Sequence, residues 1–226
     1  DYTGFVQAQQ EMELKAQVSG QITAKYFKGG DNVSAGQTLY AIDQRTYQAN
    51  VLNAQAGLAN ARAALANAAM NAERYSTLYA QNAVSKQVLD NAIMQRDQAQ
   101  ASVNAQEAIL ENAQINMTDT SVAAPFSGRI DTTALEVGNY VTAGQTTLAK
   151  ISNTDPVFVQ FSIAEPEYLQ LSGAHDNSGA AALDNLTVVL SDGSTYDLKG
   201  TVAEVNRGIN DNTGTLTVKA LFKNPA

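Results

Sequence analysis

The feature of this sequence that most limits its possible folds is an internal repeat that a long insertion divides. Two copies of one pattern begin about 108 residues apart, near Val18 and near Phe126. The first copy contains Gly20, Ile22, Gly30, Val33, Ala35, Gly36, Gln37, Leu39 and Ile42, and the second contains Gly128, Ile130, Gly138, Val141, Ala143, Gly144, Gln145, Leu148 and Ile151. A pattern that recurs in this way indicates one structural unit used twice.

Each copy has the pattern of half a small β-sandwich. An apolar strand is followed by a glycine where a turn is due, a β-branched residue, and an Ala-Gly-Gln turn before a second short strand. Neither half could bury its apolar face alone, and the entropic cost of closing a loop grows only logarithmically with its length. We therefore expect residues 15–43 and 120–152 to pack together, so that the insertion leaves and returns at one place.

The insertion, residues 44–119, has the composition of a helix pair. It contains no proline and one glycine, Gly57, and it is rich in Ala, Gln and Asn. Apolar residues recur at alternating steps of four and three, which is typical of a coiled-coil seam. The first arm has Tyr47, Val51, Ala54, Leu58, Ala61, Leu65, Ala68, Ala72, Tyr75 and Tyr79, and the second has Leu89, Ala92, Arg96, Ala99, Val103, Gln106, Leu110, Ala113 and Met117.

Residues 81–85 interrupt this seam and mark the tip of a helical hairpin. Ser85 is a candidate N-cap, and Val84 with Leu89 forms a candidate hydrophobic staple. An arm of about 35 residues would extend roughly 50 Å at 1.5 Å per residue, which places the tip far from the sandwich. Arg96 and Gln106 put polar groups into the second seam, where they would fix the register, contact a neighbouring subunit or form a solvent-facing edge.

A separate β domain is expected over residues 153–226, and residues 1–14 are expected to form a strand that joins this domain or a membrane-proximal region. Alternating strands are predicted at Val157–Phe161, Leu186–Leu190, Gly200–Val205 and Thr215–Leu221. Pro166, followed by Glu167, Tyr168, Leu169 and Leu171, predicts one short helix. The pair Asp192-Gly193 predicts a hairpin turn.

Composition excludes several kinds of function. The net charge of −8 argues against nucleic acid as a partner, because nucleic-acid binders depend on clustered Lys and Arg. The absence of cysteine excludes disulfides, thiolate metal sites and cysteine nucleophiles. No run approaches the roughly 18 to 20 apolar residues that cross a bilayer. The chain begins and ends in mid-pattern, so we expect terminal anchors to be absent from it.

The order of these parts resembles the periplasmic adaptors, or membrane fusion proteins, of resistance-nodulation-division (RND) tripartite multidrug efflux pumps, of the AcrA and MexA kind. The resemblance covers nearly the whole chain. The halves are similar to the split lipoyl domain of that family at residues 18–22 and 124–130, and residues 192–200 with 213–216 are similar to its barrel. The implied fold is multidomain α+β: a split lipoyl-like β-sandwich, interrupted by a long antiparallel coiled-coil hairpin and followed by a β-barrel.

The resemblance also implies partners and a binding site. Arg74, Leu78 and Ser85, at i, i+4 and i+11, match the Arg, Leu, Ser motif through which such adaptors engage TolC-like outer-membrane channels. It further implies an inner-membrane RND transporter as a partner, homo-oligomers (trimer or hexamer), and a periplasmic location with an inner-membrane anchor outside this chain. Neither enzymatic activity nor a cofactor is implied. Taken singly, Arg74 also fits a solvated residue of the arm, Leu78 a residue of the seam and Ser85 a helix cap.

Three other functions remain open at this stage. An adaptor of an ABC-type exporter would have the same architecture, and a purely structural coiled-coil scaffold would share the hairpin. A lipoyl or biotinyl carrier would need an acceptor lysine at the hairpin between its halves, where this chain has Asp43 and Gln44.

No catalytic or metal site is predicted. His175 lacks converging partners in the sequence, and a metal or catalytic site needs several such groups together. Methionines share no spacing that would form a copper-binding cluster; they are Met12, Met70, Met94 and Met117.

Overall fold

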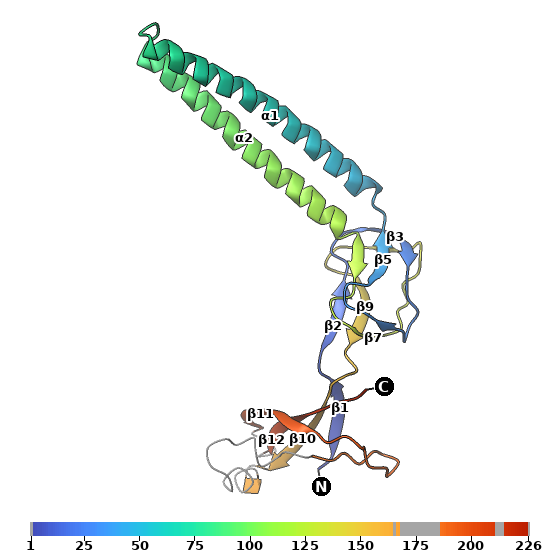
Figure 1. Cartoon of the computed structure of the whole chain (residues 1–226). Helices are drawn as coiled ribbons and strands as arrows, with labels where there is room; N and C mark the ends of the chain where they lie inside the picture. Colours follow the sequence, from blue (N-terminus) through green and yellow to red (C-terminus); the bar gives the residue numbers. More distant parts are fainter. Residues whose placement is uncertain (1, 165, 168–185, 211–214, 226) are drawn as a thin grey trace.

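The computed structural model describes residues 2–164, 166–167, 186–210 and 215–225. Three parts follow one another along an elongated molecule: a helical hairpin, a β-sandwich and a second β domain (Figure 1). The hairpin projects from the sandwich at the end opposite the second β domain.

The sandwich is assembled from both copies of the sequence repeat. The first half, which the structure extends back to Glu11, supplies β2 (Glu11–Lys15), β3 (Gly20–Lys25), β4 (Asn32–Val33) and β5 (Thr38–Ile42), and the second supplies β6 (Ser121–Ala123), β7 (Gly128–Ile130), β8 (Tyr140–Val141) and β9 (Thr147–Ser152). The two sheets have the strand orders β2-β9-β7-β4 and β6-β5-β3-β8. Each sheet therefore takes two strands from each copy, which confirms that the distant halves close into one unit.

Hydrogen bonds between the halves occur in matched pairs that reflect the repeat. The Ile22 N–H donates to the Asn139 carbonyl at 2.8 Å, and the equivalent N–H of Ile130 donates to the Asp31 carbonyl at 3.0 Å. The Ser19 hydroxyl oxygen accepts from the Ala143 N–H at 2.9 Å. In the same way, the hydroxyl oxygen of Ser127 accepts from the N–H of Ala35, also at 2.9 Å. The two halves are thus related by an approximate two-fold axis, and each completes the hydrogen bonding of the other.

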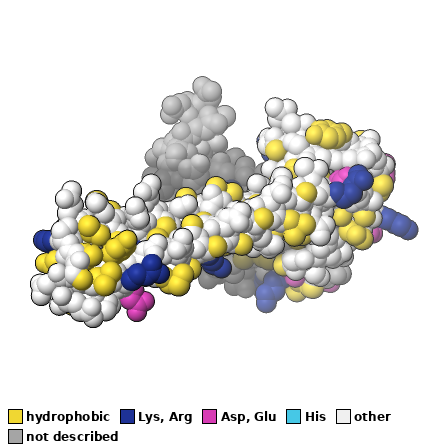
Figure 2. Space-filling view, turned by 90° about the horizontal axis from the view of Figure 1, so that it is seen from above, with side chains coloured by type: hydrophobic (Ala, Val, Ile, Leu, Met, Phe, Trp, Pro, Cys, Tyr) yellow, Lys and Arg dark blue, Asp and Glu magenta, His cyan; other side chains and the backbone are white. Residues whose placement is uncertain are grey.

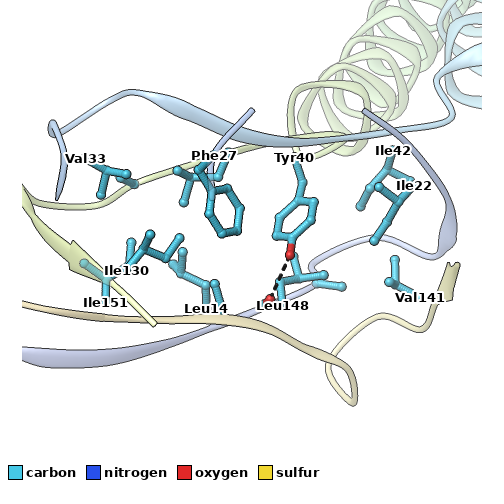
Figure 3. Close-up of a cluster of buried hydrophobic side chains, with 14 of the residues drawn as sticks. Leu14, Ile22, Phe27, Val33, Tyr40, Ile42, Ile130, Val141, Leu148 and Ile151 are labelled. Carbon is cyan, nitrogen blue, oxygen red and sulfur yellow. Dashed lines mark hydrogen bonds between the residues drawn. The ribbon is translucent and has the colours of Figure 1, made fainter. Parts of the chain in front are cut away.

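The core of the sandwich lies between the two sheets (Figure 3). Its fully buried side chains come from both halves and include Ile22, Leu39, Tyr40, Ile42, Ile130, Val141, Leu148 and Ile151. The Tyr40 hydroxyl donates to the Leu148 carbonyl at 3.2 Å, and burial raises the pKa of this phenol. Phe27 packs edge-on against Tyr40 with ring centroids 5.1 Å apart. Because each sheet alone would expose this surface, burial ties the halves together.

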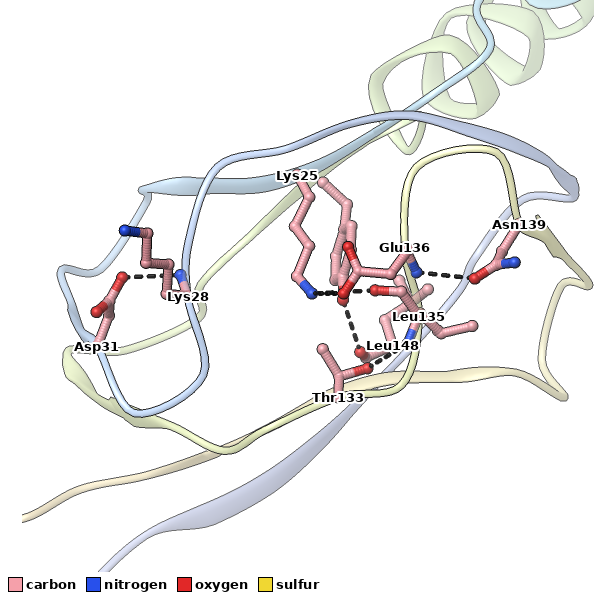
Figure 4. A network of polar contacts seen from close by, with 9 residues as sticks. Lys25, Lys28, Asp31, Thr133, Leu135, Glu136, Asn139 and Leu148 are labelled. Carbon is pink, nitrogen blue, oxygen red and sulfur yellow. Dashed lines mark hydrogen bonds and ion pairs between the residues drawn. The ribbon is translucent and has the colours of Figure 1, made fainter.

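A polar contact also joins the halves at the rim of the sandwich (Figure 4). The Lys25 ammonium lies 2.8 Å from a carboxylate oxygen of Glu136 and donates to the Leu135 carbonyl at 3.1 Å. The Lys25 side chain is only 13% exposed but that of Glu136 is 69% exposed, so solvent still screens the ion pair and its contribution is small.

The first residues of the chain belong to two different sheets, which differs from the single strand expected over residues 1–14. Strand β1 (Gly4–Ala8) pairs with β10 of the second β domain, whereas β2 pairs with β9 of the sandwich. Strand β2 occupies the place in the first half that β6 occupies in the second, and its Leu14 enters the sandwich core. The alternating pattern of β2 is compatible with a strand in either sheet, and only its pairing with β9 places it in the sandwich.

The insertion forms the predicted antiparallel hairpin of α1 (Arg45–Ala80) and α2 (Lys86–Thr118). It leaves and returns at one point, because the Ile42 N–H donates to the Thr120 carbonyl at 2.8 Å. Nearly all predicted seam residues are buried or half-buried. The exceptions are Tyr79, which is 41% exposed, and Arg96, which is exposed. Both lie in the part of the hairpin nearest the tip.

The second β domain contains a four-stranded antiparallel sheet in the order β1-β10-β12-β11. Its other strands are β10 (Val157–Ala164), β11 (Thr201–Asn210) and β12 (Thr215–Phe222). Side chains of β10 and β12 form its core, and these are Phe161, Ile163, Leu216, Val218, Ala220 and Phe222. The predicted strands in these three regions are confirmed.

The predicted strand over Leu186–Leu190 is wrong in detail. This segment makes only isolated bridges, Leu186 with Gly200 and Val189 with Thr195. Hydrogen bonds join Tyr196 to Val188 and Gly200 to Leu186, so the returning chain has two more residues than the outgoing chain between these points. That mismatch breaks the ladder.

The turn predicted between these two segments is present. Gly193 has a φ of +85°, and its N–H donates to the Leu190 carbonyl at 2.9 Å. Most of the short helix predicted after Pro166 lies outside the described residues; Pro166 and Glu167 themselves are helical.

Candidate partner-binding site at the hairpin tip

The end of α1 is closed by a motif that holds the tip in one conformation. Asn82 has a φ of +59°, in the left-handed region. Its N–H donates to the Tyr79 carbonyl at 2.9 Å, and the Ala83 N–H donates to the Leu78 carbonyl at 2.9 Å. This pair of bonds is a Schellman motif, which satisfies carbonyls that the helix end would otherwise leave unpaired. It fixes the backbone of Leu78 directly.

The start of α2 is defined by Ser85, which is the N-cap residue as predicted. Its backbone is extended, with φ −75° and ψ 157°, and its carbonyl accepts from the Val88 N–H at 3.1 Å. The Ser85 hydroxyl makes no capping hydrogen bond, which differs from the usual role of an N-cap serine. Val84 and Leu89 are both half-buried, as a hydrophobic staple requires.

The three predicted site residues lie on either side of this turn. Arg74 and Leu78 occupy the last two turns of α1, and Ser85 begins α2. Arg74 is exposed and makes no ion pair within the described residues, whereas Leu78 is half-buried. A guanidinium without an internal partner can donate to carbonyl or carboxylate groups of another molecule. The arrangement offers a cation, an apolar side chain and a small hydroxyl to a partner.

The tip is also low in charge and exposes some apolar side chains. Between Tyr75 and Leu89 the only charged residue is Lys86. Tyr79 and Val88 are exposed there at 41% and 37%. Apolar side chains gather at the free end of the hairpin, at the left of Figure 2. An exposed apolar patch beside an unpaired cation is typical of a protein-binding surface.

The base of the hairpin has no site for a swinging cofactor. Strand β5 ends at Ile42 and α1 begins at Arg45, so Asp43 and Gln44 connect the sandwich directly to the helix. The Asp43 carboxylate accepts from the Arg45 backbone N–H at 3.0 Å and from its guanidinium at 2.6 Å. These hydrogen bonds lower the pKa of Asp43 to about 2. Aspartate here stabilises the turn into α1 rather than carrying a modification.

Within the described residues, no three His, Cys, Asp or Glu side chains converge on a possible metal position. His175 lies outside those residues. The methionines are dispersed: Met12 is on β2, Met70 on α1, and Met94 and Met117 on α2.

Sequence reasoning missed Asn82, although a recognisable signal was present. Asn82 follows the C-cap residue Gln81, and asparagine is the second choice after glycine for the left-handed position just beyond a helix C-cap. Of the alternatives stated for Arg96, the structure agrees with a solvent-facing edge, because the side chain is exposed and borders an open groove.

Comparisons with known proteins assign the chain to a class. Residues 10–152 match the model of the RND membrane fusion protein barrel-sandwich hybrid domain, and residues 156–226 match the RND membrane fusion protein β-barrel domain. The class is therefore that of membrane fusion proteins built from these two domains. The chain belongs to the RND membrane fusion protein family, as the sequence resemblance predicted, and such proteins are adaptors, not enzymes.

Known relatives align with nearly the whole chain. Multidrug export protein AcrE of Escherichia coli is 38% identical over 98% of this chain and 59% of its own length. Antibiotic efflux pump periplasmic linker protein ArpA of Pseudomonas putida is 37% identical over 98% of this chain and 57% of its own length. The chain thus spans somewhat more than half the length of these relatives.

Among solved structures, a MacA-MexA chimera that contains the Pseudomonas aeruginosa MexA α-hairpin domain superposes over 100% of this chain and 72% of its own. The TM-score is 0.69 at 28% identity. This similarity confirms the predicted fold class. Within the part of the chain that the structure describes, no helix is long and apolar enough to cross a bilayer.

Proposed function

We propose that this chain is the periplasmic adaptor subunit of a tripartite multidrug efflux system. It bridges an inner-membrane RND transporter and a TolC-like outer-membrane channel, and its hairpin tip binds the channel. The observation that carries the proposal is the geometry of the tip: a rigid turn at the end of two long helices presents an unpaired Arg74 beside an apolar cap. Membership of the RND family supports the nature of the partners.

The proposed location is the periplasm, attached to the inner membrane by a part of the protein outside this chain. The adaptor works as a homo-oligomer, a trimer or hexamer, whose hairpins form a conduit. Transport itself is driven by the transporter, and the adaptor seals the path and transmits conformational change. The binding roles at the tip are an apolar anchor for Leu78, hydrogen-bond donation for Arg74 and close packing for Ser85.

The test is complementation by variants of the full-length protein. Cells that lack the adaptor gene would be restored with Leu78→Ala or Arg74→Asp, and drug accumulation would be measured together with cross-linking of the tip to the channel. Removing an anchor side chain from the centre of an interface typically costs more than 1 kcal/mol, so we expect each variant to weaken cross-linking about tenfold and to raise drug accumulation.

Two variants on the arm provide matched controls. Leu52 is an exposed leucine on α1 near the base of the hairpin. Arg62 is an exposed arginine in the middle of α1, and its ion pair with Glu107 of α2 is itself exposed and contributes little free energy. Leu52→Ala and Arg62→Asp should leave cross-linking and drug efflux close to those of the wild type. Full restoration of efflux by both tip variants would refute the assignment of the tip.

A further inference from the structure

The hairpin is joined to the sandwich by two short stretches of backbone that lie side by side. Asp43 and Gln44 lead into α1, and Asp119 and Thr120 follow the end of α2. The Ile42 N–H donates to the Thr120 carbonyl at 2.8 Å, which couples the two stretches at their base. Two adjacent connections fix where the hairpin leaves, but they allow it to swing about the line that joins them. A fixed direction therefore requires a third contact away from that line.

Tyr47 supplies this third contact. It lies in the first turn of α1 and is half-buried, and its hydroxyl donates to the Ser19 carbonyl at 2.7 Å. Its ring packs against the core of the sandwich, and no other side chain of the hairpin, all of whose residues are described, belongs to that core. Ser19 precedes β3 and is separate along the chain from both connections. The hairpin is thus held at a point that the two connections do not control.

The acceptor of this hydrogen bond is itself fixed by both halves of the sandwich. The Ser19 hydroxyl oxygen accepts from the Ala143 N–H at 2.9 Å, which bonds Ser19 to the second half. The next residue, Gly20, lies so close to the hairpin base that an added Cβ would stand 2.6 Å from the Cγ2 atom of Ile42. A larger residue there would push the strand away from the base. The Ser19 carbonyl therefore gives Tyr47 an anchor point that does not move with the hairpin.

Tyrosine has the two properties that this contact requires. Its ring is apolar and packs against the core, and its hydroxyl places a hydrogen-bond donor at the end of the ring. Phenylalanine would keep the packing and lose the donor, whereas alanine would lose both. Because the bond is half-buried, removal of the hydroxyl leaves the Ser19 carbonyl without this donor at a place where water has restricted access.

The neighbouring contact between Asp43 and Arg45 has a different effect. The Arg45 side chain is 88% exposed, and its hydrogen bonds run to Asp43 in the connection itself. They shape the turn into α1, but they join neither side chain to the sandwich. An exposed ion pair of this kind also contributes little free energy. It cannot hold the direction of the hairpin in the way that the Tyr47 contact does.

We propose that Tyr47 is a positioning residue, which sets the direction of the hairpin relative to the sandwich and so the place at which the tip meets its partner. The end of α1 at Ala80 lies about 50 Å beyond Tyr47 at 1.5 Å per residue, so a swing of about 10° displaces the tip by about 9 Å. Such a displacement is larger than the reach of a hydrogen bond or an apolar contact. This inference rests on the channel contact proposed above and adds the residue that delivers the tip to it.

The deciding experiment measures the direction of the hairpin in the full-length protein by double electron–electron resonance. Residues 1–226 contain no cysteine, so spin labels at introduced cysteines report on defined positions; any cysteine elsewhere would be replaced by serine. Met70 on α1 is labelled together with either Met12 on β2 or Tyr140 on β8, all three of which are exposed. Strands β2 and β8 belong to different sheets, so swings in different directions are detected. Met70 lies about 35 Å beyond Tyr47, where a swing of about 10° moves the label by about 6 Å.

With Tyr47 present we expect narrow distance distributions with one maximum. Tyr47→Ala should widen them by several ångströms, and Tyr47→Phe, which loses only the hydrogen bond, should give an intermediate width. Cross-linking of the tip to the channel should fall in the same order, although the tip residues are unchanged. Thermal melting would verify that the sandwich is folded in each variant. If Tyr47→Ala failed to fold, Tyr47→Phe would decide, because it keeps the ring in the core.

Matched controls separate the contact from general effects of the substitutions. Tyr26 is exposed at 58% just beyond the other end of β3, and Tyr26→Ala and Tyr26→Phe should leave the distances unchanged. Arg45→Ala should widen them much less than Tyr47→Ala does. Broad distributions in the wild type, unchanged widths in both Tyr47 variants, or equal widening in Arg45→Ala would each overturn the inference. Widened distances with cross-linking at the level of the wild type would refute the role in delivering the tip.

The distance measurements involve no partner, so they also separate this inference from the proposed function. Unchanged distances in the Tyr47 variants, while Leu78→Ala still abolishes efflux, would remove the positioning role and leave the adaptor function intact. Distances that widen in Tyr47→Ala, without any effect of Leu78→Ala or Arg74→Asp on efflux, would instead show that Tyr47 directs the hairpin and that the tip does not bind the channel.

Discussion

At the scale of single residues, two small motifs determine how the hairpin begins and how it turns. Asp43 and Arg45 close the connection between β5 and α1, and Asn82 closes the end of α1. Both act on the backbone through hydrogen bonds of known geometry, so both can be tested by one substitution.

The first prediction concerns the pH dependence of the hairpin base. Hydrogen bonds and the charge of Arg45 hold the pKa of Asp43 at about 2, below its ordinary 3.8. A carboxyl whose pKa is lowered by folding contributes stability above its unfolded pKa, and that contribution is lost as the pH falls from about 3.8 toward about 2. In Arg45→Ala the pKa of Asp43 should rise toward its ordinary value without reaching it, because the backbone N–H of residue 45 still donates to the carboxylate. NMR titration of the Asp43 carboxyl measures this, and an unchanged value in the variant would contradict the stated cause.

The second prediction concerns the left-handed residue at the tip. In Asn82→Val a β-branched side chain must adopt a positive φ, which should lower the free energy of unfolding by about 1–2 kcal/mol. Asn82→Gly, in which the same backbone is unstrained, is the control and should stay within about 1 kcal/mol of the wild type. Chemical denaturation provides both values. Equal stability of the two variants would show that the turn relaxes into another conformation.

At the scale of elements, the hairpin is held by a seam of small and medium side chains. Alanine is the commonest residue of its seam, so the helices approach closely there but bury little area per residue. Polar groups in the seam can then influence the register. Gln106 is half-buried on α2 and faces Gly57 on α1, where an added Cβ would lie 2.7 Å from the Gln106 amide oxygen.

The third prediction tests this contact between the helices. Gly57→Ala should raise helix propensity by up to about 1 kcal/mol, but part of the gain is lost because the Gln106 side chain must move. In the Gln106→Ala background the substitution Gly57→Ala should show its full gain. A double-mutant cycle of unfolding free energies gives the difference, and strict additivity would mean that the two residues do not constrain each other.

At the scale of the whole molecule, the sandwich and the hairpin are independent in their packing. The hairpin enters and leaves between Ile42 and Thr120, whose backbone groups are already hydrogen-bonded to each other. The sandwich core is formed by strands on both sides of this point, and only Tyr47 of the hairpin packs against it.

The fourth prediction follows from that independence. If residues 45–118 are replaced by a short Gly-Ser linker, the sandwich should keep its fold, because the linker shortens the loop that folding must close. Its Tm should be no lower than that of the sandwich in the intact chain, and the environment of buried Tyr40 should be preserved in near-UV circular dichroism. Loss of the Tyr40 signal would show that the hairpin is required to align the two halves.

Much of this architecture follows from the sequence alone. The divided repeat, the two seams and the turn between them follow from local patterning, because a strand or a helix needs one apolar face at a regular period. The same spacing located the tip, whereas Arg74, Leu78 and Ser85 were assigned there by the resemblance to RND adaptors. Periodicity shows which face of an element is apolar. For this chain it was sufficient to define the hairpin and most strands, but not the division of residues 1–14 into two strands or the irregular pairing of Leu186–Leu190.

Other features were decided only by the tertiary structure. The pattern of β2 fits either sheet, and its assignment to the sandwich depends on a partner strand far along the chain. The seam at Arg96 is regular in sequence, yet it opens into a groove because the facing residues of α1 are too small to fill it. Local sequence specifies which faces of the elements are apolar and must be buried. Which segment buries each face depends on contacts between distant parts of the chain, because several segments can pack against the same apolar surface.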